Sequence, residues 1–315
     1  MSLDIHPAVW LSLGAAVSFG MAGVLLKRGL QYASALTAAV ISVTVTTIFV
    51  WIVVAATGSL GVMLTWAVLP FLAAGLIAPG LARLAFFTGV QRIGVSRASA
   101  VVSAAPMFAV GAAALVLGEQ PPSAVVGGAV LVVVGGALLS YRGARETGWR
   151  RRDMAFPIMA ALGFAFRDTL SRWGLMQFPH PLAAAAVATA MSLAVMWVFA
   201  ALRAWARTAT RVDPGAAPPD AVRPRAGGVW SFHPVGAAFL VTSGLCEGTA
   251  YLTMWRALAI GNVSVVSPLV NSHALFAVLL AAVFLRDIER VTWRIVVACV
   301  LIVAGVLLVI LARSA

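Results

Sequence analysis

Charged residues are scarce in this chain, and their scarcity excludes a soluble protein. Only 10% of the 315 residues are Asp, Glu, Lys or Arg, whereas soluble domains carry about 25%. Residues 29–82 contain no charged side chain, and neither do the stretches 98–118, 173–202, 257–285 and 295–312. A helix needs about 20 apolar residues to cross the hydrocarbon core of a bilayer. The chain is therefore predicted to be an integral membrane protein that contacts the lipid bilayer.

Cysteine and histidine are also rare, which excludes several kinds of site. The two cysteines, Cys246 and Cys299, both lie in apolar runs, where packing is favoured over a disulfide or a metal site. There are four histidines and ten carboxylates. No His-Glu-x-x-His run, pair of aspartates or nucleophile with an adjacent base occurs among them. We expect no enzyme active site, no metal and no cofactor.

The basic excess of the chain is explained by topology. The formal net charge is +12, and 17 of the 22 Lys and Arg residues lie in five loops that would share one side of the membrane. This asymmetry predicts cytoplasmic loops rather than a nucleic-acid partner. It also predicts that both termini lie outside. Residues 1–7 lack a basic n-region, so the first apolar run is expected to be a retained span.

The apolar runs predict an all-α integral membrane fold of ten transmembrane helices. Helices are expected because the alternation typical of barrel strands is absent. Residues 203–230 contain four prolines and five arginines and predict a polar loop. The predicted helices span 8–26, 36–56, 68–90, 95–117, 123–140, 154–176, 181–202, 235–258, 262–285 and 291–312.

The same hydrophobic module occurs twice in the chain. The matched positions are 18–30 with 163–175 at an offset of 145, Gly94 with Gly261 at 167, and Gly135 with Gly305 at 170. Residues 1–146 and 147–315 are therefore predicted to be two repeats of five helices. Because five is odd, the repeats insert with opposite orientation. Inverted repeats of this kind are typical of secondary transporters, whose substrate site lies between the repeats near the middle of the membrane.

One motif of the first half recurs in the second half. The first half carries Pro106 and then Gly118 and Glu119, followed by a glycine-containing fifth helix. The second half repeats this pattern through 271–273, 286–290 and Gly305, with departures at His273, which stands near where the first half has Pro106, and at 287–289, which replace a simple Gly–Glu pair. These motifs resemble the EamA domain of the drug/metabolite transporter superfamily. The resemblance implies a ten-helix carrier of amino acids or other small metabolites, often in exchange for protons. It implies a cavity bounded by helices one, three, four, six, eight and nine.

The orientation of the termini is left open, because the family implies cytoplasmic termini whereas the charge asymmetry predicts external ones. The resemblance and the apolar composition predict a multi-pass protein of the cell inner (plasma) membrane. A homodimer is a further open alternative.

A few polar residues lie in the middle of predicted spans. A charge there costs about 2.5–3.5 kcal/mol even on insertion scales, so such residues are candidates for function. The candidates for substrate binding or coupling are Arg83, Arg167, Asp168, Glu247, His273 and Asn271.

These charges predict a mechanism and a structural alternative. At the repeat offset Glu247 corresponds to Gly80, one turn from Arg83. Arg83 is expected to hold a substrate carboxylate, and Glu247 to exchange a proton. Asp168 is a second candidate for coupling or for a substrate amine. The alternative is a pair of buried ion pairs, Arg83 with Glu247 and Arg167 with Asp168 or a neighbour.

Adjacent helical residues point about 100° apart, so Arg167 and Asp168 are not expected to face the same partner. The two arginines and two carboxylates sum to zero, which favours a zwitterionic solute.

The sequence thus predicts a secondary transporter that exports amino-acid-like or other small organic solutes by alternating access, with protons as a candidate coupling ion. The alternatives are an uncoupled facilitator or exchanger of small organic anions, and a membrane regulatory protein without transport.

Overall fold

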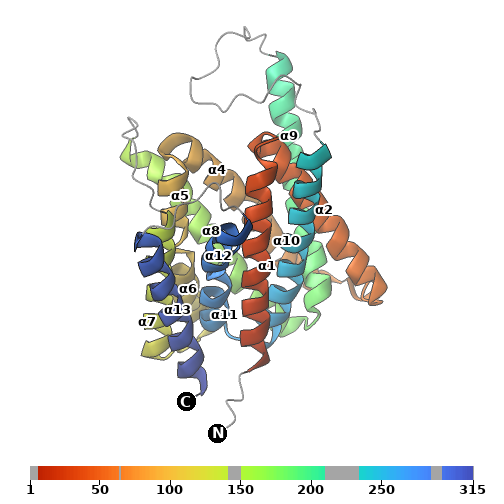
Figure 1. The fold of residues 1–315 in the computed structure, drawn as a ribbon. Helices are drawn as coiled ribbons and strands as arrows, with labels where there is room; N and C mark the ends of the chain where they lie inside the picture. The colour runs from red at the N-terminus through yellow and green to blue at the C-terminus, as the bar shows by residue number, and fades with distance from the viewer. Residues whose placement is uncertain (1–5, 64, 141–149, 210–233, 285–292, 315) are drawn as a thin grey trace.

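The computed structural model describes residues 6–63, 65–140, 150–209, 234–284 and 293–314, which fold into a bundle of helices without a strand among them (Figure 1). The helices are α1 (Pro7–Gly29), α2 (Ala35–Ala56), α3 (Leu69–Gly75), α4 (Ala82–Ile93), α5 (Val95–Val102), α6 (Ala105–Leu117), α7 (Ser123–Ser140), α8 (Ala155–Gln177), α9 (Pro181–Ala209), α10 (Pro234–Ile260), α11 (Val263–Asn271), α12 (His273–Phe284) and α13 (Trp293–Ser314). The π-helical segment η3 (Leu76–Leu81) joins α3 to α4, and short 3-10 segments are η1 (Gly61–Met63), η2 (Trp66–Val68) and η4 (Arg151–Met154).

The membrane location and the all-helical fold are confirmed. Within the described residues, eight helical segments are long and apolar enough to cross a membrane, and α7 provides a shorter apolar helix. The remaining long helix, α8, carries Arg167, Asp168 and Arg172 in its second half. The helical segments follow the ten predicted ranges, but eight of them meet the criterion of length and hydropathy, so a count of ten spans stays a prediction.

Three of the segments are broken near prolines. Ala78, just before Pro79, has φ −150° and ψ 133°, because a residue before proline avoids the helical region. Pro106 lies in the first turn of α6, where its missing N–H costs nothing. Pro268 lies inside α11, which ends three residues later at Asn271. These breaks separate α3 from α4, α5 from α6 and α11 from α12.

The helices pack in matched sets (Figure 1). α1 packs against α10 and α12, and α8 packs against α4 and α6. α2 packs against α9, where the Trp51 indole Nε1 donates to the Ala186 carbonyl oxygen at 3.1 Å. α7 packs along α13, and both chain termini lie at one end of the bundle. One buried apolar cluster joins residues of α1, α2, α3, α8, α9 and α10.

Glycines bring the backbones of α7 and α13 into contact. A Cβ added at Gly128 would lie 2.6 Å from the Gly305 carbonyl oxygen, and one added at Gly135 would lie 2.8 Å from the Ala298 carbonyl oxygen. Residue numbers rise along α7 as they fall along α13, so the two helices are antiparallel. Lipid provides no hydrophobic driving force between helices, so the close van der Waals packing that small residues allow holds such crossings together.

Some predicted features lie outside the described residues. They are the repeat boundary at 146–147, the motif at 286–290 and most of the predicted polar loop. The first part of that loop is described and is helical, because α9 continues to Ala209. Residues 203–209 were predicted as loop, and this was wrong: alanine and arginine dominate the segment, and both favour a helix.

An ion pair outside the apolar spans fixes the start of α8. Asp153 accepts a hydrogen bond from Arg92 Nη1 at 2.9 Å and another from the Arg150 backbone N–H at 3.0 Å. These bonds, the one from Arg92 first, hold the pKa of Asp153 below its ordinary value of 3.8. The carboxylate therefore stabilises the fold above that pH, and this contribution is lost as the pH falls through the lowered pKa.

Asp153→Asn should melt slightly below the wild type at neutral pH, because the Arg92 side chain is half exposed and the pair is partly screened. The two melting temperatures should converge as the pH falls below the lowered pKa. Thermal unfolding in detergent across a pH series measures both. A difference that stays constant over the whole acidic range would contradict this account.

Gly128→Ala should destabilise the protein by about 1–3 kcal/mol, since the methyl group would push α7 and α13 apart. Gly111→Ala on α6 is the matched control, because a Cβ there meets nothing within 4 Å. It should be neutral or slightly stabilising, since alanine favours the helix. Equal melting temperatures for the two variants in detergent would show that the α7–α13 contact is not tight.

Candidate functional site

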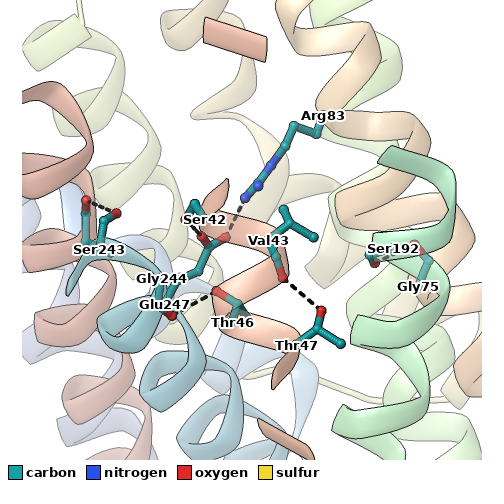
Figure 2. Close-up of polar contacts among 11 residues, drawn as sticks. Ser42, Val43, Thr46, Thr47, Gly75, Arg83, Ser192, Ser243, Gly244 and Glu247 are labelled. Carbon is teal, nitrogen blue, oxygen red and sulfur yellow. Dashed lines mark hydrogen bonds and ion pairs between the residues drawn. The ribbon is translucent and has the colours of Figure 1, made fainter. Parts of the chain in front are cut away.

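Glu247 in α10 is held by side chains from two other helices (Figure 2). Arg83 of α4 donates from Nη2 to Oε1 of Glu247, and Ser42 of α2 donates from Oγ to Oε2 at 2.8 Å. Glu247 is 7% exposed. A carboxylate at this depth needs both charge and hydrogen-bond partners to offset desolvation. The ion pair foreseen as the structural alternative is present.

Small residues around Glu247 let α2 approach α10. A Cβ at Gly244 would lie 2.8 Å from the Ser42 carbonyl oxygen, and one at Gly248 would lie 2.6 Å from the Phe49 ring. The close approach is what places the Ser42 hydroxyl within reach of Glu247. The bond from Ser42 to Glu247 joins two helices that are far apart in the sequence, so single helical patterns do not predict it.

The second pair lies within α8. Asp168 Oδ1 accepts from Arg167 Nε at 2.9 Å and from Nη2 at 2.7 Å. Arg167 also lies 3.7 Å from the Met254 Sδ atom and 5.5 Å from the centre of the Phe164 ring. The second ion pair of the structural alternative is therefore also present, because the long arginine side chain folds back to its neighbour although the two backbone positions point about 100° apart. Both residues are buried.

Tyr251 lies between the two ion pairs. It follows Glu247 by one turn of α10 and precedes Met254, the residue that contacts Arg167, by three positions. Its phenol interacts electrostatically with all four charged groups. Its ring packs edge-on against Phe19 of α1, with the ring centres 5.4 Å apart. Sequence reasoning missed Tyr251, although the i, i+4 spacing from Glu247 was a signal that could have found it.

His273 and Asn271 flank the break between α11 and α12. His273 Nδ1 lies 3.2 Å from the Val270 carbonyl oxygen, and its ring lies 6.2 Å from that of Phe19. Asn271 Nδ2 donates to the Ser267 carbonyl oxygen at 2.8 Å. His273 thus borders the Tyr251 contact through Phe19, whereas Asn271 is bonded to its own helix.

The structure therefore brings four of the six candidates together as two ion pairs on α4, α8 and α10, with Tyr251 between them. The four charges sum to zero. Among the described residues, no group of three or more His, Cys, Asp or Glu side chains could hold a metal ion. The arrangement can present positive and negative groups to a solute at the same depth.

Removing one member of the first pair should cost more than removing both. Arg83→Met leaves Glu247 buried without its cation, a loss of about 3–5 kcal/mol in other buried pairs. Arg83→Met combined with Glu247→Met should recover most of that loss, because no buried charge remains. Melting temperatures of the single and double variants in detergent test this. A double variant as unstable as the single one would show that the two residues do not depend on each other.

Comparison with known proteins gives the family and the fold. Residues 6–141 match the sequence model of the EamA-like transporter family. No curated protein matches the chain, whereas 29 chains of solved structures do. One of them, described as a crystal structure of a protein, superimposes with a TM-score of 0.71 at 19% identity, over 97% of this chain and 97% of its own. At that identity the likeness shows the fold alone. The first half of this multi-pass membrane protein therefore matches the EamA-like transporter family, as its motifs predicted.

Proposed function

We propose that the protein is a secondary transporter that moves small bipolar organic solutes across the cytoplasmic membrane by alternating access. The proposal rests on two largely buried ion pairs, Arg83–Glu247 and Arg167–Asp168, which lie on α4, α8 and α10. Each pair has no net charge. Charges inside a membrane protein are costly and mark substrate or ion pathways. The family match supports transport, and solute, coupling and mechanism are argued below from the site.

Matched hydrogen bonds support two inverted repeats, 1–146 and 147–315. Thr46 of α2 donates to the Gly244 carbonyl oxygen of α10, and Ser192 of α9 donates to the Gly75 carbonyl oxygen of α3, each at 2.8 Å (Figure 2). Ser192 follows Thr46 by 146 positions, close to the offset of 145 in the sequence. The same contact is therefore built once from each half.

The α7–α13 crossing has the corresponding symmetry. At the offset of 170, Gly135 corresponds to Gly305 and Gly128 to Ala298. The observed contacts are Gly128 with Gly305 and Gly135 with Ala298, so exchanging the two halves turns one contact into the other. Antiparallel packing of equivalent helices is what a two-fold axis in the membrane plane requires.

The equivalence of Glu247 with Gly80 needs revision on this basis. Matching the two carbonyl acceptors, Gly244 with Gly75, places Glu247 at Ala78, two positions before Gly80. The π-helical segment η3 contains Ala78, and its wider turns take up additional residues. The acidic residue of one half thus stands where the other half has its helix break.

Competition for Arg83 provides a coupling mechanism. When Glu247 is ionised, it holds the Arg83 guanidinium and keeps it from other anions. When Glu247 takes up a proton, it loses its negative charge. The Arg83 guanidinium then becomes available to a substrate carboxylate. Ser42 donates a hydrogen bond to the ionised carboxylate. Proton and substrate thereby bind together at one site.

The second pair supports a zwitterionic solute. Asp168 accepts through Oδ1 from Arg167, and among the described residues its Oδ2 receives no hydrogen bond. That oxygen can accept from a substrate ammonium while Arg83 holds the carboxylate. Tyr251 lies between the two and can donate or accept. A solute with both charges, such as an amino acid, leaves neither pair with an excess charge.

Flux in proteoliposomes tests the proposal. Amino acids, amines, organic acids and sugar phosphates are each tested with and without a pH gradient. Wild type should transport one class saturably and faster with the gradient, and Glu247→Gln should lose the response to the gradient. Asp153→Asn is the matched control, because it also removes a carboxylate from an arginine pair, but at the start of α8. It should keep the response.

Other outcomes separate the alternatives. Saturable flux of anions that ignores the gradient in wild type and Glu247→Gln would support an uncoupled facilitator or exchanger. Glu247 would then be a structural partner of Arg83. Absence of flux for every class, with both variants folded, would contradict transport of the solutes proposed here.

A further inference from the structure

Three polar atoms in the core have no hydrogen-bond partner among the described residues. They are Ser171 Oγ, Trp255 Nε1 and Ser267 Oγ. Their residues are 0%, 1% and 2% exposed. Buried polar groups in folded proteins are almost always hydrogen-bonded, so each exception requires a physical explanation. The ion pairs and Tyr251 do not use any of these atoms.

Two of the three atoms lie in one direction from the ion pairs and Tyr251. Ser171 follows Arg167 by one turn of α8, and Trp255 follows Tyr251 by one turn of α10. α8 and α10 run the same way here, because Arg172 of α8 donates to the Leu258 carbonyl oxygen of α10, further along both helices than the contact of Arg167 with Met254.

Ser171 and Trp255 are therefore each displaced by about 6 Å, one helical turn, toward the α10–α11 turn. Ser267 lies on α11, which starts directly after α10.

Trp255 is held in place without its N–H. Its ring packs edge-on against Phe71 of α3, with the ring centres 5.6 Å apart. Phe71 is itself fully buried against α8, where a Cβ at Gly174 would lie 2.6 Å from it. Packing thus explains the ring and leaves the indole N–H unexplained. A phenylalanine would fill the same place without leaving a donor in the core.

The N–H completes a row of polar groups on one face of α10. Glu247, Tyr251 and Trp255 are spaced by four residues, so they lie on one side of the helix and follow one another along it. Along the helix the row consists of the ionised carboxylate of Glu247, the phenol of Tyr251 and the uncharged indole N–H of Trp255. Because an indole can only donate, whatever binds at its end has to offer an acceptor.

We propose that Trp255 and Ser171 form a second, uncharged subsite for the transported solute. It receives a carbonyl or amide oxygen that lies about 6 Å, one helical turn, from the charged groups bound at the ion pairs. The inference rests on the proposed function and narrows it, since it favours zwitterions with a polar acceptor at the far end over zwitterions with an aliphatic end.

Binding to the full chain in detergent tests the subsite without requiring flux. Glutamine and norleucine are similar in length, but glutamine ends in an amide and norleucine in a methyl group. Apparent affinities follow from the rise in melting temperature with ligand concentration. Wild type should bind glutamine more tightly. Trp255→Phe should weaken glutamine up to about tenfold, the effect of one hydrogen bond, and leave norleucine unchanged.

Two further variants separate binding from stability. Trp66→Phe is the matched control, since Trp66 is 86% exposed, and it should change neither affinity. Ser171→Ala should weaken glutamine in the same direction as Trp255→Phe, with an unchanged melting temperature in the absence of ligand.

The results divide clearly. Equal affinities for glutamine and norleucine in wild type, or binding of neither, would overturn the subsite. So would a Trp255→Phe variant that melts lower without ligand but keeps the glutamine preference, because the N–H would then serve the fold. A glutamine preference that depends on Trp255, without flux in liposomes, would retain the subsite and refute the transport function on which it rests.

Discussion

A carboxylate inside a bundle of membrane-spanning helices persists only where other groups replace the water it has lost. Glu247 meets this requirement through the Arg83 guanidinium and the Ser42 hydroxyl, each supplied by a different helix. The packing follows from that need. α10 carries Gly244 and Gly248 on either side of Glu247, and their missing side chains let α2 come close enough for Ser42 to reach the carboxylate. Arg83 follows the broken segment η3 by two residues.

The same requirement makes the site responsive to a ligand. A buried ion pair contributes little net stability, because desolvation offsets most of the attraction, yet breaking it on one side is costly. A solute that brings its own charges can replace one partner without that cost. The helix breaks near Pro79, Pro106 and Pro268 lie in segments that pack around α8 and α1, so the elements around the site are divided into shorter units. The two inverted repeats proposed above provide two equivalent ways to close around one site, which is the physical basis of alternating access.

Much of the fold could be predicted from the sequence because its signals are local. Long runs without charge predicted the helical segments. The pairing of Arg83 with Glu247 was foreseen because the two residues carry opposite charges near the middle of their predicted spans. The bond between Arg167 and Asp168 was foreseen only as part of the structural alternative, because a rule about backbone direction ignores the reach of an arginine side chain.

Tyr251 and Trp255 were missed for a different reason. In an apolar helix, an aromatic residue that faces lipid and one that faces a site have the same sequence signal. The orientation of α10 about its own axis decides which residues face the site. That orientation is fixed by contacts with α2 and α8, which are distant from α10 in the sequence. The shift of the proposed repeat offset by two positions was also not visible in the sequence, since a π-helical turn leaves no mark in composition.

The central claim is that substrate and Glu247 compete for Arg83, and that Glu247 takes up a proton when the substrate binds. Infrared difference spectroscopy of the protein in lipid, with and without the transported solute, observes this protonation at the carboxyl group itself. Binding should produce a protonated-carboxylic-acid band that is absent from Glu247→Gln and retained in Asp153→Asn. A substrate-induced spectrum without that band in wild type, or with the same band in Glu247→Gln, would contradict the account.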